Sequence, residues 1–208
     1  MTTPNKTQDI TFWFDAACPF CWMTSRWIKE VEKVRDIKVN WVPMSLGVLN
    51  EGRDHLSDDY KAEMKMAWGP ARIFAAVATK EPEKVDALYT AMGSRIHNGD
   101  DRPRADKVAE AIPAALEEVG LDASYAEVAK GDSWDKELRA FHQTAMDEVG
   151  DEVGTPVIKF GEHAFFGPVI TRLPKGEEAG EIFDAAARIA QFPYFFEIKR
   201  SRTEGPQL

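Results

Sequence analysis

The feature that most constrains the fold is the motif Cys18-Pro19-Phe20-Cys21, which contains the only two cysteines among 208 residues. The apolar residues 10–14 before the motif predict a strand, and residues 22–34 after it have helical periodicity. At a helix N-terminus, free backbone amides and the helix dipole favour a thiolate. A dithiol between a strand and a helix therefore indicates thiol–disulfide redox chemistry.

Three other uses of this cysteine pair are less well supported. A structural zinc site needs about four ligands. The histidines show neither metal-ligand spacing nor a second cysteine pair beside them, so no metal site is expected. A structural disulfide across so short a loop would contribute only about 2 kcal/mol. A pair of inert, buried cysteines is the third alternative, against which Pro19 favours a helix that begins inside the motif.

The charge and hydropathy of the sequence exclude some classes of binding partner and a membrane span. A formal net charge of −9 argues against a nucleic-acid partner, and the basic run at residues 199–202 is interpreted as a solvated tail rather than a binding site. No segment approaches the roughly 18 apolar residues of a membrane span. Residues 1–9 are polar and lack the apolar core of a signal peptide. We therefore expect a cytoplasmic protein, in which a Cys-x-x-Cys pair is normally reduced and catalytic.

The two ends of the chain predict a sheet, and the middle predicts helices. Residues 37–42 alternate as a second strand, which gives a βαβ unit with parallel strands and a right-handed crossover. Helices are expected at residues 58–68, 70–79, 82–95, 105–119, 124–130 and 134–149. The pair Gly69-Pro70 separates the first two of these, and Pro113 is expected to kink or split the fourth.

Strand patterns return near the C-terminus. Residues 156–160 and 163–166 predict a hairpin, and residues 176–191 predict an amphipathic helix. The order βαβ, helices, ββα is that of a thioredoxin-like α/β fold with a large all-helical insertion. We therefore expect a discontinuous thioredoxin-like domain, made of residues 1–49 and 151–208, and an inserted helical domain of residues 50–150.

The dipeptide Thr155-Pro156 opens the third predicted strand. A cis peptide bond there would turn the Thr155 backbone toward the cysteine sulfur and leave an edge on which a substrate chain could pair beside the thiol. This context predicts the cis form, and the alternative is an ordinary trans proline at a strand start. The same proline would then be part of the catalytic site.

The two cysteines are expected to differ in role. Cys18 is predicted to be the exposed nucleophile, and Cys21, one helical turn further on, the buried resolving thiol. Helix-end electrostatics would lower the pKa of the first thiol from about 8.5 to roughly 7. Phe20 neither donates hydrogen bonds nor carries charge, which predicts a dithiol less oxidising than the strongest known. Asp15 is interpreted as a surface loop carboxylate rather than a proton-transfer group.

Residues 12–27 resemble the DsbA-like (FrnE-type) proteins of the thioredoxin superfamily, and more closely the actinobacterial mycothiol-dependent nitroreductase group. Further matching blocks lie at residues 44–50, 88–98, 153–157, 164–169 and 195–204. The resemblance implies a cytoplasmic, usually dimeric thiol oxidoreductase with no bound cofactor, whose electrons come from mycothiol as co-substrate. It also implies that Cys18 attacks, that Cys21 is its partner and that Pro156 is cis. Phe20 stands where the family more often has Trp.

The resemblance also suggests which residues bind substrate. The residues predicted to line the substrate cleft are Phe20, Thr155, Asn50, Tyr60, His97 and Trp68. Asn50, Tyr60 and His97 match family blocks on segments that would cover the cysteine motif. Each has a structural alternative, namely a turn or helix cap for Asn50, core packing for Tyr60 and a helix-end position for His97. Trp68 would be a stacking wall, or packing between helices.

The leading functional hypothesis is a mycothiol-dependent reductase whose substrate is a protein disulfide or a small electrophile such as a nitroaromatic compound. No glycine-rich dinucleotide fingerprint follows a predicted strand, so direct use of NADPH would need another protein. One alternative is a DsbA-type protein disulfide oxidase or isomerase, which would need an oxidising compartment. Another is a redox sensor or chaperone whose helical insert changes when the disulfide closes.

Overall fold

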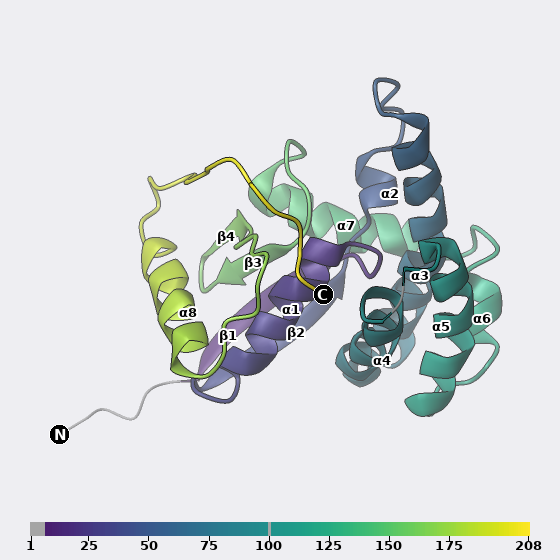
Figure 1. Ribbon diagram of the computed structural model, residues 1–208, viewed down its shortest axis with the longest axis horizontal. Coiled ribbons are helices and arrows are strands. Elements are labelled where there is room, and N and C mark those ends of the chain that lie inside the picture. The colour runs from purple at the N-terminus through teal and green to yellow at the C-terminus, as the bar shows by residue number, and fades with distance from the viewer. Residues whose placement is uncertain (1–6, 100) are drawn as a thin grey trace.

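The computed structural model describes residues 7–99 and 101–208, which form one four-stranded sheet surrounded by helices (Figure 1). The strand order is β2-β1-β3-β4, with β1 parallel to β2 and the other two pairs antiparallel. The strands are β1 (Gln8–Phe14), β2 (Ile37–Pro43), β3 (Val157–Phe160) and β4 (His163–Phe166). The predicted βαβ unit and C-terminal hairpin are thus both present, on opposite sides of β1.

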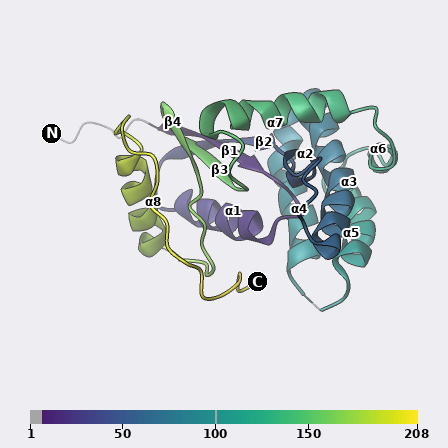
Figure 2. The same ribbon diagram turned by 90° about the horizontal axis from the view of Figure 1, so that it is seen from above.

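Alternation along β1 explains why both faces of the sheet are covered. Ile10, Phe12 and Phe14 point into the main hydrophobic cluster, together with α1 (Pro19–Val31) and α8 (Glu177–Ile189). Trp13 points the other way, into a second cluster with Ala145 and Met146 of α7 (Asp135–Val149). Figure 2 shows α7 and α1 on opposite sides of the sheet. The central strand is therefore buried on both faces, as in layered α/β folds.

Helix α1 begins earlier than its apolar pattern alone predicts, at Pro19 rather than residue 22. Cys18 is the N-cap residue, with extended backbone angles, and its sulfur accepts the Cys21 amide. Pro19 occupies the first helical position, where its missing N–H costs nothing. The helix ends at Val31 instead of residue 34 and buries Trp27 completely against the sheet.

Two prolines do not divide helices as predicted. Helix α3 is continuous from Asp58 to Lys80 through Gly69-Pro70, and α5 (Arg104–Glu118) is continuous through Pro113. In α3 the proline is buried, and the turns after it bury Ile73, Phe74 and Val77 completely or almost completely. Burial of that apolar face outweighs the loss of one backbone hydrogen bond. The predicted break between residues 68 and 70 is therefore wrong.

The remaining helices are short or lie in the middle of the chain, and they pack against the sheet and against α3. They are α2 (Leu46–Leu49), α4 (Val85–His97) and α6 (Tyr125–Val128), with a short 3₁₀ turn at Pro82–Lys84. The ring of Phe14 on β1 stacks on Tyr89 of α4 at 4.1 Å between centroids and meets Phe74 of α3 edge-on at 5.0 Å. The boundaries proposed near residues 50 and 150 stay a prediction.

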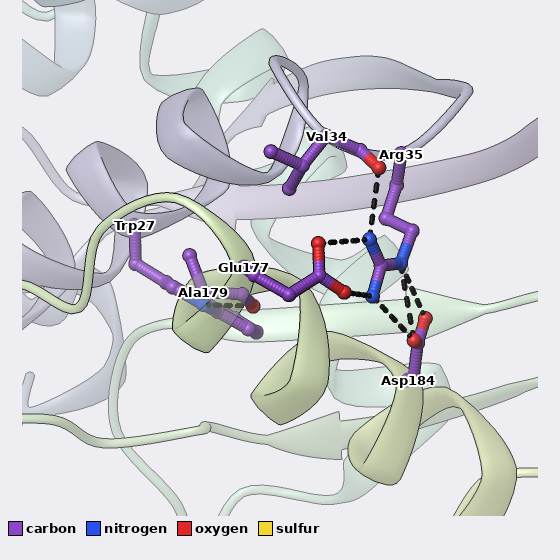
Figure 3. A network of polar contacts seen from close by, with 6 residues as sticks. All are labelled: Trp27, Val34, Arg35, Glu177, Ala179 and Asp184. Carbon is purple, nitrogen blue, oxygen red and sulfur yellow. Dashed lines mark hydrogen bonds and ion pairs between the residues drawn. The ribbon is translucent and has the colours of Figure 1, made fainter.

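Helix α8 is held on the sheet by a network of polar contacts around Arg35 (Figure 3). The Arg35 guanidinium lies 2.6 Å from the Glu177 carboxylate and 2.8 Å from the Asp184 carboxylate, and also donates to the Val34 carbonyl. Behind it, the Trp27 indole donates to the Ala179 carbonyl at 3.0 Å. These contacts fix α8 against the end of α1 that is remote from the cysteines.

No helix in the described part of the chain is long and apolar enough to cross a membrane. After α8, the chain has no regular helix or strand. It turns back along the molecule, and the C-terminus comes to lie near α1 in both ribbon views (Figures 1 and 2).

Candidate active site

The two cysteines lie at the start of α1, at the end of β1. Both are free, and the Cys21 amide lies 3.5 Å from the Cys18 sulfur. Cys18 is 7% exposed and Cys21 is fully buried. The predicted order of burial is therefore found, but the prediction of an exposed Cys18 is wrong. The reason is that a segment distant in sequence, at Thr155, covers the sulfur.

Burial dominates the acidity of both thiols. Burial raises the pKa of Cys18, while the Thr155 side chain and the amides of Cys21 and Phe20 act in the opposite direction. The predicted value near 7 is therefore not met, because desolvation outweighs the helix-end donors. Burial and the neighbouring charge of Cys18 hold the pKa of Cys21 well above its usual range. Cys18 is thus the thiol that ionises first, as a nucleophile must.

The peptide bond between Thr155 and Pro156 is cis, and it places Thr155 over the dithiol. The Thr155 carbonyl lies 3.9 Å from the Cys18 sulfur. Its hydroxyl is buried and has no hydrogen-bond partner among the described residues. The Thr155 carbonyl therefore faces the nucleophilic sulfur, and β3 begins directly after Pro156.

Asp15 is buried, not exposed as the sequence suggested. Its carboxylate accepts the Ala17 amide at 2.8 Å and the Leu46 amide at 2.7 Å, so it ties the loop before Cys18 to the start of α2. Burial raises the pKa of Asp15 to about 6, despite those two bonds. Its charge also raises the pKa of Cys18. A carboxyl group that titrates near neutrality next to a dithiol can hold or release a proton there.

A second polar group near the dithiol was not found from the sequence. The Tyr89 side chain of α4 is fully buried, and its phenol acts to lower the pKa of Cys21, although burial outweighs this effect. Arg26 of α1 lies 4.0 Å above the Trp22 ring and 5.9 Å from the Tyr89 ring. The sequence signal was a tyrosine on an otherwise apolar helix face, which commonly has a partner for its hydroxyl.

Two of the predicted substrate residues, Tyr60 and Asn50, interact with each other. Burial raises the pKa of Tyr60, and the charge of Cys18 is the next largest contribution, while a hydrogen bond with Asn50 lowers it. Asn50 also ends helix α2, where its amide donates to the Leu46 carbonyl at 2.8 Å. Asn50 thus has the helix-cap role that was considered as its structural alternative, and it also lies near Tyr60.

His97 contacts the loop that leads to the cysteines. Its Nε2 lies 2.8 Å from the Ala16 carbonyl, and its ring stacks on Trp22 at 5.8 Å between centroids. Burial lowers the pKa of His97 to about 4, so the ring is neutral at pH 7 and donates from Nε2 to the carbonyl. His97 therefore positions the loop before Cys18 from the last turn of α4.

Trp68 packs against the other side of α2. A Cβ at Gly47 would lie 2.6 Å from its indole nitrogen, and the guanidinium groups of Arg72 and Arg139 lie 5.0 and 5.2 Å from its ring. With Asn50 it lines a cavity of about 210 Å³ whose lining does not include Cys18. The structure gives Trp68 a packing role, and no contact with the dithiol is found in the described part of the chain.

Phe20 is half-buried on the outside of the motif, and a cation lies on its ring. The guanidinium carbon of Arg202, near the C-terminus, is 4.6 Å from the ring centroid. These two residues are 182 positions apart, so no local sequence pattern predicts that they meet. Among residues 7–99 and 101–208, no group of three or more His, Cys, Asp or Glu side chains is arranged to hold a metal ion.

Comparison with known proteins agrees with this geometry. A family model described as "Mycothiol-dependent nitroreductase Rv2466c" matches residues 17–200. The "Uncharacterized protein Rv2286c" of Mycobacterium tuberculosis is 28% identical over 197 residues, which are 93% of this chain and 82% of that protein.

Solved structures share the fold at low sequence identity. The oxidoreductase DsbA of Xylella fastidiosa has a TM-score of 0.54 at 15% identity, covering 90% of this chain and 88% of its own. A probable DsbA oxidoreductase of Streptomyces coelicolor has a TM-score of 0.51 at 17% identity, covering 96% and 97%. These similarities confirm the predicted thioredoxin-like α/β fold with helices between its halves.

The matched region includes both cysteines, the cis Thr155-Pro156 bond and all the inserted helices. The chain is therefore an enzyme of the thiol–disulfide oxidoreductase class, as the cysteine motif predicted. It belongs to the Rv2466c-like family of mycothiol-dependent nitroreductases.

Proposed function

We propose that Cys18 and Cys21 carry electrons from mycothiol to a disulfide or to a small electrophile of the nitroaromatic type. The observation that supports this most directly is the position of Cys18 at the N-cap of α1, beside the cis Thr155-Pro156 bond and in front of the buried Cys21. Membership of the family supports mycothiol as the electron donor.

The reaction with a disulfide proceeds in balanced steps. The Cys18 thiolate attacks one sulfur, the substrate S–S bond breaks, and the leaving thiolate takes the electron pair and a proton. Cys21 then loses its proton, attacks the Cys18 sulfur and releases the second substrate thiol, which leaves Cys18 and Cys21 joined. One mycothiol thiolate opens that bond to form a mixed disulfide on Cys18, and a second releases mycothiol disulfide. Two thiols are oxidised for each disulfide reduced.

With a small electrophile, the same two electrons pass to the substrate. The dithiol closes to Cys18–Cys21, two protons and two electrons go to the acceptor, and two mycothiol molecules restore the thiols. We assign the binding of a substrate, or of the sugar part of mycothiol, to hydrogen bonds from Tyr60 and Asn50, because Tyr60 interacts both with Asn50 and with the charge of Cys18. The half-buried Phe20 ring offers an apolar surface beside the nucleophile.

Exchange of each cysteine for serine tests the assignment. Cys18→Ser is expected to abolish mycothiol-dependent turnover, because serine does not attack a disulfide under these conditions. Cys21→Ser is expected to keep partial activity, because mycothiol can resolve the mixed disulfide on Cys18 without it. The measurement is steady-state turnover of a disulfide and of a nitroaromatic substrate, with folding of both variants checked by circular dichroism. Full activity of Cys18→Ser would contradict the proposal.

We also propose that the enzyme acts in the cytoplasm as a homodimer. Membership of the Rv2466c-like family motivates these two statements. Light scattering after gel filtration tests the second one, because a dimer has twice the chain mass of 23.3 kDa. A single species at the monomer mass over the micromolar range would exclude it.

A further inference from the structure

The basic segment at residues 199–202 does not extend into solvent away from the molecule. After α8, the chain returns to the N-terminal end of α1 and is fixed there by contacts near its end. The Gln207 amide donates to the Thr171 carbonyl at 2.8 Å. The Glu204 carboxylate accepts from Arg172 at 2.7 and 3.1 Å and from the Thr171 hydroxyl at 2.6 Å.

The segment that holds Glu204 is itself attached to the cysteine helix. Residues 171 and 172 follow Pro168, whose carbonyl accepts the Thr24 hydroxyl of α1 at 2.9 Å. Thr24 is fully buried and lies one turn beyond Cys21. A continuous series of contacts therefore fixes the C-terminal segment relative to the dithiol, and its basic residues 199–202 are exposed to solvent, as predicted.

Arg202 is the residue of the C-terminal segment that contacts the cysteine motif. Its guanidinium lies 4.6 Å from the Phe20 ring centroid, two residues beyond Cys18. Among the described residues, it makes no ion pair and no hydrogen bond, whereas nearby Arg172 is paired with Glu204. A guanidinium stacked on an aromatic ring keeps its five N–H donors at the edge, in the plane that suits a bidentate carboxylate.

We propose that Arg202 is a specificity-determining residue that binds a carboxylate on the substrate attacked by Cys18. The inference rests on the proposed function, since it concerns the substrate of the same thiol. The chain as a whole is acidic, with a net charge of −9, so an unpaired cation on the Phe20 ring of the cysteine motif is a local exception to the field that an anionic substrate meets. Arg202 would offset that repulsion and orient the anion.

The test compares two disulfide probes that differ in their carboxylates. Both 5,5′-dithiobis(2-nitrobenzoate) and 2,2′-dithiobis(5-nitropyridine) are nitroaryl disulfides, but only the first is anionic. In each case, Cys18 attacks one sulfur, a coloured thiolate leaves with the electron pair, and Cys21 displaces the second. The measurement is the second-order rate with the reduced enzyme, followed by absorbance, for the wild type, Arg202→Gln and the control Arg200→Gln.

We expect Arg202→Gln to slow the carboxylate probe about threefold to fivefold, the effect of one partly exposed ion pair, and to leave the neutral probe unchanged. Arg200→Gln removes the same charge without contacting Phe20, so it should change the ratio of the two rates much less. Equal ratios in Arg202→Gln and the wild type, or equal effects of both substitutions, would overturn the inference while leaving Cys18 as nucleophile. A wild-type enzyme inert to both probes would overturn the proposed function as well.

Discussion

The Asp15 carboxyl group is held out of water, 1% exposed, by amides from two different segments. Because burial raises its pKa to about 6 from an ordinary 3.8, the folded state binds the proton more tightly than the unfolded chain does. Stability contributed by such a group falls as pH rises between those two values. A difference of about two pKa units corresponds to a cost of about 3 kcal/mol at pH 7.

Replacing Asp15 by Asn removes that titration. The free energy of unfolding of Asp15→Asn, relative to the wild type, should rise by about 2 kcal/mol between pH 4 and pH 7. Urea unfolding at several pH values measures this difference. The control is Asp122→Asn, because hydrogen bonds from Ser124 lower the pKa of Asp122. Its effect on stability changes with pH only at lower pH, so its difference from the wild type should stay nearly constant from pH 5 to pH 7. A constant difference for Asp15→Asn would contradict the assignment.

The same substitution should also change the reactivity of the dithiol. The Asp15 charge raises the pKa of Cys18, so its removal favours the thiolate. Alkylation of Cys18 by iodoacetamide at pH 7 is therefore expected to be several times faster in Asp15→Asn than in the wild type. An unchanged or slower rate would show that Asp15 does not act on the nucleophile.

The sequence alone pointed to those residues whose roles depend on neighbours close to them in the sequence. Cys18, Cys21 and the Thr155-Pro156 pair were found because the motif and the strand-opening proline have recognisable local patterns. Asp15, Tyr89 and Arg202 were not found, because their environment comes from segments far along the chain. A loop carboxylate is usually exposed, and only the position of Leu46 shows that this one is not.

At the scale of the elements, α4 packs closely on α1 at Gly93. A Cβ added at Gly93 of α4 would overlap the Trp22 ring of α1. Trp22 is next to Cys21, is 3% exposed and donates to the Asn98 side chain at 3.1 Å. The absence of a side chain at Gly93 therefore lets the inserted helix pack directly on the helix that carries the dithiol.

Exchange of this glycine for alanine should lower stability, although alanine favours helix. Gly93→Ala is expected to cost about 1–3 kcal/mol, because Trp22 has to move in a packed core. The matched control is Gly69→Ala in α3, where the nearest atom to the new Cβ is 3.4 Å away. That variant should be neutral or gain up to about 1 kcal/mol from helix propensity. Thermal unfolding compares them, and equal changes in both variants would contradict the packing argument.

The helices and strands were predictable from the periodicity of apolar residues. The exception is that helices α3 and α5 continue through a proline. The pattern of α3 predicted a break at Gly69-Pro70 because local signals treat proline as a helix terminator. The helix continues because its burial partners lie on both sides of that position. Local propensity is overruled here by contacts that a single sequence does not display.

At the scale of the whole molecule, the main hydrophobic cluster joins several inserted helices to the sheet, and both cysteines belong to it. Tyr89 of α4 contacts both Phe14 of β1 and Trp22 of α1. Phe14 and Trp22 are close in sequence to Cys18 and Cys21, and all of these residues belong to the same hydrophobic cluster. The order of strands and helices predicted the fold class, but not this continuity, nor the return of the C-terminus to the motif. Both depend on how the two halves of the chain pack together.

The most direct test of the central claim is the intact mass of reduced Cys21→Ser after exposure to mycothiol disulfide and, separately, to glutathione disulfide. This variant keeps the nucleophile but cannot resolve a mixed disulfide internally. The account predicts rapid addition of one mycothiol to Cys18, with much slower addition of glutathione, and no addition when Cys18 is also replaced by Ser. The account would be contradicted if no mycothiol adduct formed on Cys18, or if an adduct still formed in the variant that also lacks Cys18.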